Sequence, residues 1–135
     1  MRVYLIITAL FGLCAFVGCG ERSGIPLRFI LPNDYRGLVQ IIEDSKTGLD
    51  VEEQAGHYTY TIPAGGQLRV TSLRPFQSWH KESATFQNGA ALLTGTDDSV
   101  PESVVAFREL PETISNGVTI VCYFVGTQKE AENSR

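Results

Sequence analysis

Short segments of β-strand character, separated by turn residues, occupy most of the chain between residues 27 and 125. The clearest is residues 57–62, where Tyr58, Tyr60 and Ile62 alternate with more polar residues. A two-residue alternation is typical of a half-buried strand, and no segment shows a convincing 3.6-residue helical period. The sequence therefore predicts an all-β fold, because strands are the elements its patterning supports.

About seven short strands are expected. The clearest segments cover residues 27–31, 38–43, 57–62, 68–73 and 118–125, and weaker ones cover 84–86, 90–93 and 104–107. The turn residues 63–66 lie between two alternating strands and predict a hairpin over residues 57–73, whereas 76–81 reads as a loop or a short helical turn. This pattern favours an antiparallel β-sandwich of immunoglobulin-like or transthyretin-like kind over residues 25–127, followed by a polar, frayed tail at 128–135.

The N-terminus has the architecture of an export signal. Arg2 is followed by an apolar run over residues 3–13, and small Gly18 directly precedes Cys19. This order of charge, apolar core and small residue is typical of secretory signals. Residues Phe16 to Cys19 resemble the lipobox of bacterial signal peptidase II substrates. The resemblance implies removal of residues 1–18 and a Cys19 that carries a diacylglycerol and an acylated amine, palmitate being one such acyl group.

Two other interpretations of the N-terminus remain open. The first is an ordinary secretory signal cut nearby, and the second is an uncleaved helix ending near Gly20. A membrane-spanning helix needs about 20 apolar residues, and this run is slightly shorter and contains Gly12 and Gly18. The lipoprotein interpretation is favoured, and it predicts a tether over residues 19–24 with a lipid-anchored domain close to its membrane.

The same resemblance implies a place in the cell. A lipidated Cys19 would hold the domain in the bacterial cell envelope, with the membrane itself as the first partner. Gly20, rather than an aspartate, follows Cys19. In a host with two membranes this favours the outer one.

Charge and cysteine content restrict the remaining possibilities. Without residues 1–18 the chain keeps 117 residues, with 10 basic and 15 acidic side chains. This acidic balance argues against nucleic acid or an anionic membrane surface as a partner. A lipidated Cys19 would leave Cys122 as the one free thiol, so no intramolecular disulfide is expected. Cys122 lies in the most apolar strand and is expected to be buried.

Three further segments resemble an uncharacterised domain family of small bacterial lipoproteins. They are residues 29–37, 58–66 and 123–127, and they are distributed along most of the length of the mature chain. The resemblance implies an envelope location. It implies no activity and transfers no functional residue.

Two segments concentrate residues that often bind partners. Tyr35 and Arg36 follow the turn after the first strand, and they form either a recognition corner or an ordinary strand connection. The segment Arg74 to Glu82 contains the only tryptophan of the chain. There Arg74, Phe76, Trp79 and His80 form either a binding surface or, through the aromatic rings, one closed end of the sandwich.

No motif with chemical function accompanies these residues. His57 and His80 are separated and lack companions at metal-ligand spacing, so no metal or cofactor is expected. No nucleophile and base pair is recognisable either. The sequence therefore predicts a non-enzymatic interaction or structural module whose partner is an envelope protein. The alternative is a module that binds carbohydrate or peptidoglycan through residues 74–79, and an envelope hydrolase is a weaker third hypothesis.

Overall fold

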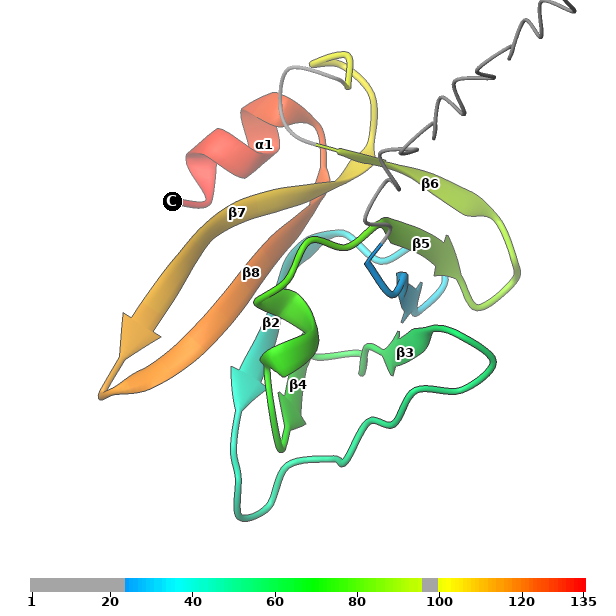
Figure 1. Ribbon diagram of the computed structural model, residues 1–135. Coiled ribbons are helices and arrows are strands. Elements are labelled where there is room, and N and C mark those ends of the chain that lie inside the picture. The colour runs from blue at the N-terminus through cyan, green and yellow to red at the C-terminus, as the bar shows by residue number, and fades with distance from the viewer. Residues whose placement is uncertain (1–23, 96–99) are drawn as a thin grey trace, which may run out of the picture.

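The computed structural model describes residues 24–95 and 100–135, so the predicted signal peptide and Cys19 lie outside the described residues. Eight strands form one sheet in the order β3-β1-β5-β6-β7-β8-β2-β4 (Figure 1). The strands are β1 (Leu27–Leu31), β2 (Gly37–Glu43), β3 (Tyr58–Thr61), β4 (Gln67–Val70), β5 (Glu82–Phe86), β6 (Ala91–Gly95), β7 (Ala106–Ser115) and β8 (Val118–Gly126). The all-β prediction is confirmed, with eight strands in place of about seven.

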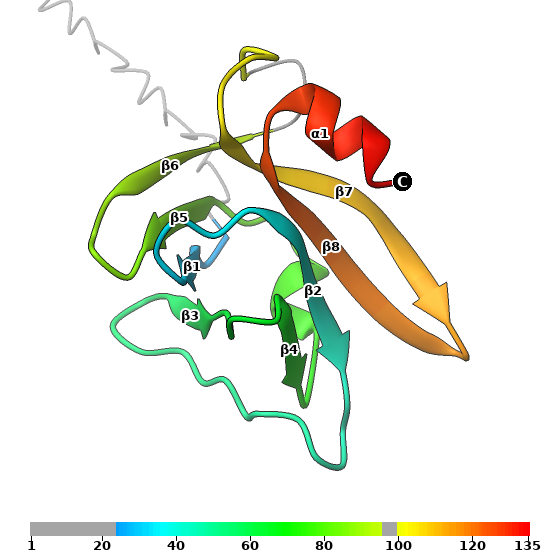
Figure 2. The same ribbon diagram turned by 180° about the vertical axis from the view of Figure 1, so that it is seen from behind.

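The sheet curls into a nearly closed barrel. Its two edge strands, β3 and β4, are consecutive in the chain and are joined by residues 62–66 alone. A link of five residues spans only about 17–20 Å even when extended, so the two edges must lie near each other. Figures 1 and 2 show the strands wrapped around a common interior. The predicted two-layer sandwich is replaced by this single curved sheet.

The expectation of antiparallel pairing is wrong for four of the seven strand pairs. β1 pairs in parallel with both β3 and β5, β2 pairs in parallel with β4, and β6 pairs in parallel with β7. The predicted hairpin over residues 57–73 is also wrong, since β3 joins β1 while β4 joins β2. The Pro63–Gly66 turn is present, with the Gly66 N–H donating to the Pro63 carbonyl at 2.9 Å. It carries the chain from one sheet edge to the other.

Among residues 24–95 and 100–135, the longest hairpin is formed by β7 and β8. Asn116 and Gly117 connect the two strands with φ values of 52° and 76°. Two successive positive φ values are what a type I′ turn requires, and Asn-Gly is the pair that best adopts it. The resulting hairpin projects from the barrel in both views (Figures 1 and 2).

Alternating side chains fill the barrel interior. Phe29, Tyr60, Phe107 and Tyr123 are each 1% exposed. Phe107 stacks on Tyr123 with ring centroids 4.4 Å apart, and Phe29 lies 4.8 Å from Phe107. Each ring contributes a large apolar area, so this aromatic cluster forms the centre of the core. Cys122 is a free, buried thiol, which confirms the expected burial of its side chain.

The C-terminal segment is a short helix and not the frayed tail that its polarity suggested. Helix α1 (Gln128–Asn133) begins at Thr127 with a capping box, in which the side chains of Thr127 and Glu130 bind each other's backbone N–H. The helix buries Ala131. These local bonds satisfy N–H groups that would otherwise lack partners. No helix of the described residues is long and apolar enough to cross a membrane.

Candidate binding surface

Residues of the connection from β4 to β5 line three surface hollows. This connection contains a 3-10 helix over Arg74–Phe76, where Pro75 occupies a position at the start of the helix that needs no N–H donor. Phe76 turns inward, and its ring centroid lies 5.1 Å from that of Tyr60. Trp79 turns outward and is 61% exposed. The two aromatic residues that the sequence grouped together therefore have different environments.

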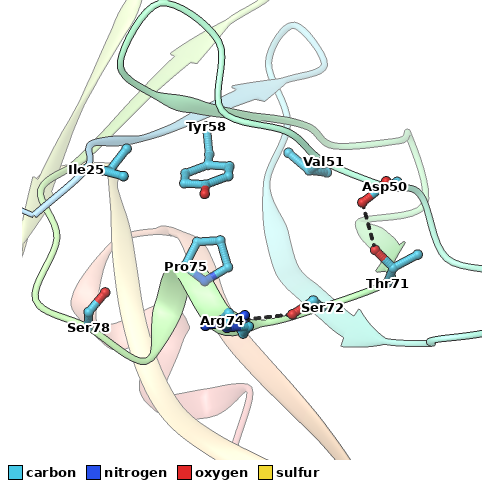
Figure 3. A pocket seen from close by; sticks show the side chains of 9 residues that line it. All are labelled: Ile25, Asp50, Val51, Tyr58, Thr71, Ser72, Arg74, Pro75 and Ser78. Atoms are coloured by element: carbon cyan, nitrogen blue, oxygen red, sulfur yellow. Dashed lines mark hydrogen bonds between the residues drawn. The ribbon is translucent and has the colours of Figure 1, made fainter.

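The first hollow has a volume of about 470 Å³. Figure 3 shows Tyr58 on one side and Pro75 on the other, with Arg74 near Pro75 and Asp50 near Thr71. The Thr71 hydroxyl donates to Asp50 at 3.2 Å, and the Arg74 backbone N–H donates to the Ser72 hydroxyl at 3.2 Å (Figure 3). Within the part of the chain that the structure describes, the Arg74 guanidinium has no hydrogen bond or ion pair. It is available to an anionic group.

The second hollow lies beside Trp79 and has a volume of about 370 Å³. It is lined by the exposed indole, by two further residues of the same connection, and by residues of strands β5, β6 and β7. The lining residues are Ser78, Trp79, His80, Glu82, Thr94, Gly95 and Glu109. Since Ser78 lines both this hollow and the first one, the two adjoin along the 74–80 segment.

A hydrogen-bond network holds the base of the second hollow. The Tyr123 hydroxyl donates to Glu82 Oε1 at 2.5 Å, and His80 Nε2 lies 3.1 Å from the same oxygen. His80 Nδ1 lies 2.7 Å from the Ser78 carbonyl oxygen. Both ring nitrogens of His80 thus lie within hydrogen-bond distance of oxygen atoms. His80 and Tyr123 also line a third, smaller hollow of about 130 Å³ together with Phe76 and Glu109.

The carboxylates of this region influence each other. Partial burial raises the pKa of Glu109, and the charge of Glu82 raises it further, while His80 lowers it. Burial, with the charge of Glu82, raises the pKa of Tyr123 far above the physiological range. Tyr123 therefore stays neutral and acts as a donor, and Glu109 binds a proton more readily than an isolated glutamate does.

Tyr35 and Arg36 have partners of their own. The Tyr35 hydroxyl donates to the Leu38 carbonyl at 2.6 Å, and Arg36 Nη2 donates to both carboxylate oxygens of Glu130 at 2.9 and 2.7 Å. Neither residue lines any of the three hollows. The structure therefore brings Arg74, Trp79 and His80 to adjoining hollows and leaves the Tyr35 corner as a strand connection tied to α1.

Sequence reasoning missed Glu109, Thr94 and Tyr58 as lining residues. Glu109 belongs to β7 and Thr94 to β6, and each reaches the hollow beside Trp79 only because those strands neighbour β5 in the sheet. No local motif marks them. Glu82 was within the suspected segment, and its spacing of two residues from His80 was the one available signal.

The described residues of this region support neither a metal site nor the hydrogen bond of a serine hydrolase. Within residues 24–95 and 100–135, no group of three or more His, Cys, Asp or Glu side chains could hold a metal ion. In the same residues, His80 contacts the backbone carbonyl of Ser78 and the Glu82 carboxylate, and no serine hydroxyl bonds to it. The contact that would favour a serine hydrolase is thus not observed among the described residues.

The fold resembles that of a solved protein of bacterial origin. A crystal structure of a Bacillus anthracis protein, provisionally designated a lipoprotein, aligns with a TM-score of 0.53 and 12% sequence identity. The alignment covers 84% of this chain and 80% of that protein. No family model and no curated protein matches the sequence. At this identity the likeness concerns the fold, and the chain is therefore an eight-stranded barrel-like domain similar in fold to that Bacillus anthracis protein.

Proposed function

We propose that this chain is a lipid-anchored, non-enzymatic module of the bacterial cell envelope that binds a partner through the surface of residues 74–82. The exposed side chain of Trp79 is the observation that carries the proposal. The other aromatic rings of the described residues are buried or partly buried. A large indole left in water lacks the stabilisation that burial would provide, and tryptophan is enriched among residues that dominate binding energy.

The lipoprotein part of the proposal has two supports. One is the Gly18-Cys19 pair behind an export signal, and the other is the fold shared with a protein provisionally designated a lipoprotein. Mass spectrometry of the mature N-terminus tests it directly. A diacylated, N-acylated Cys19 is expected, and an unmodified Cys19 would refute the anchor.

The partner-binding role is tested by a pair of alanine variants. Trp79→Ala should leave the melting temperature near that of the wild type and abolish partner cross-linking in intact cells. Phe76→Ala is the matched control, because Phe76 packs on the core and its loss should lower the melting temperature. Unchanged cross-linking by Trp79→Ala would contradict the role of this surface.

A saccharide is the second candidate partner, and the lining of the hollow beside Trp79 favours it. An aromatic wall lies next to the hydroxyl of Thr94 and the carboxylates of Glu82 and Glu109, groups that can receive a sugar ring and its hydroxyls. Titration of Trp79 fluorescence with cell-wall fragments should then shift the emission. An unchanged emission across a broad panel would remove the carbohydrate hypothesis.

A further inference from the structure

The chain enters the barrel directly beneath Trp79. A Cβ atom on Gly24 would lie 1.5 Å from the Trp79 carbonyl oxygen and 2.6 Å from its carbon. The backbone of Gly24 therefore packs on the Trp79 peptide, where only glycine fits. Three residues later the Leu27 N–H donates to the Lys81 carbonyl at 2.8 Å. The start of the domain and the loop that carries Trp79 are thus held together.

Two exposed apolar side chains flank this entry point. Ile25 is 41% exposed and lines the hollow next to Pro75, and Trp79 is 61% exposed beside the second hollow. Cys19 lies five residues before Gly24, which is at most about 17–18 Å of extended chain. A lipid on Cys19 therefore keeps Gly24, and the Trp79 backbone that packs on it, within about 18 Å of the lipid-bearing residue.

We infer that the face formed by Ile25, Arg74, Trp79 and Lys81 docks on the membrane that holds the lipid of Cys19. This inference rests on the proposed function, and it names the partner of the Trp79 surface as a zwitterionic phospholipid interface. Tryptophan prefers the headgroup region, because its ring is apolar and its N–H can still donate a hydrogen bond. Ile25 adds apolar area beside it.

The charges of this face fit a headgroup that carries both signs. Arg74 and Lys81 are exposed cations, and the Arg74 guanidinium has no partner among the described residues. Glu82 and Glu109 line the hollow beside Trp79. A zwitterionic headgroup offers a phosphate to the cations and an ammonium to the carboxylates. The excess of acidic side chains after residue 18, 15 against 10 basic ones, disfavours a strongly anionic surface.

The single tryptophan of the chain makes the inference directly measurable. The full-length lipidated protein is reconstituted in vesicles of phosphatidylcholine and phosphatidylethanolamine whose phosphatidylcholine chains are brominated near the headgroup. Trp79 emission should move to shorter wavelength, lose intensity relative to unbrominated vesicles, and become less accessible to aqueous acrylamide. Emission that keeps its solution wavelength, resists bromine and stays open to acrylamide would overturn the docking.

A relocated tryptophan is the control. In the variant that combines Trp79→Phe with Ile114→Trp, the indole moves to the projecting β7–β8 hairpin, where Ile114 is 74% exposed. This variant should bind vesicles equally and show no quenching by bromine. Equal quenching in both proteins would also overturn the inference, because it would mean that no particular face is presented.

Vesicle flotation tests the lipid anchor on Cys19 separately from the docking of the Trp79 face. A chain that begins at residue 20, and so has neither the apolar run nor Cys19, should fail to float, whereas the lipidated protein should float. A lipidated protein that does not float removes the anchor and the docking together. One that floats with Trp79 unquenched leaves the anchor intact and refutes the docking alone. If soluble cell-wall fragments then protect Trp79 from acrylamide, the surface is a saccharide site and the docking is wrong.

Discussion

Arg108 provides the sharpest test of how this barrel is held together. Its side chain is fully buried, at 0% exposure. Nε donates to the Gly126 carbonyl at 3.1 Å, Nη1 to the Gln128 side chain at 3.2 Å, and Nη2 to the carbonyls of Pro101 and Val104 at 3.0 and 2.9 Å. One guanidinium thus links β7, the end of β8, the start of α1 and the segment 100–104. In the residues that the structure describes, no carboxylate pairs with it.

The cost of losing these bonds follows from the groups left behind. In Arg108→Met, three backbone carbonyls and one side-chain amide lose their donor. An unsatisfied buried group costs about 1–3 kcal/mol. The Gly126 bond is buried and the other three are partly buried, so water can replace some of the latter. The guanidinium also no longer has to be dehydrated. We therefore expect a destabilisation of about 3–5 kcal/mol.

Urea unfolding of the domain measures this difference. The midpoint should fall while the slope of free energy against urea stays the same. Arg28→Met is the matched control, because Arg28 is exposed on β1 and its replacement should change stability by less than about 0.5 kcal/mol. A loss below about 1 kcal/mol in Arg108→Met would refute the reasoning, since the four bonds would then contribute no more than a surface contact.

Three further predictions concern a turn, a thiol and a carboxylate. Gly66→Ala should destabilise by more than about 1 kcal/mol in urea unfolding, because Gly66 has φ +78° and its Cβ would lie 2.0 Å from the Tyr35 hydroxyl; Gly65→Ala, which meets open space, should be nearly neutral. Cys122 is 5% exposed, so a thiol reagent should react with it only when the protein unfolds, and rapid reaction under native conditions would contradict the packing. Hydrogen bonds from the Thr127 N–H and from Arg36 lower the pKa of Glu130, so its stabilising effect is present above the ordinary glutamate pKa and is lost as the pH falls through the lowered value. The stability gap between wild type and Glu130→Gln should accordingly close on acidification, and a gap that is independent of pH would exclude this contribution.

Local patterns were sufficient to locate most strands. The alternation at residues 57–62 corresponds to strand β3, and the apolar run at 118–125 corresponds to strand β8. Such patterns can be read locally, because the alternation of side chains is a property of the strand itself. The Asn116-Gly117 pair was an unused signal for the β7–β8 hairpin. The helix α1 was missed although Thr127 and Glu130 have capping-box spacing, since its polar composition was interpreted as fraying.

Local sequence patterns did not predict which strands pair with each other. The sequence shows two alternating strands on either side of the Pro63–Gly66 turn, and adjacent strands most often pair with each other. In the barrel, β3 instead pairs with β1 and β4 with β2. Pairing depends on contacts between distant segments, and the turn residues are compatible with both arrangements.

The sequence by itself determined that this chain forms strands, that Cys122 is buried, and that residues 74–80 contain the aromatic and basic groups most suited to recognition. Only the tertiary structure decided that Phe76 packs on the core while Trp79 points to solvent, and that Glu109 on β7 joins His80 and Glu82 beside it. The reason is physical. The alternation of side chains along a strand is set by its own backbone. The exposure of a side chain and the identity of its neighbours are set by how eight strands close around one interior.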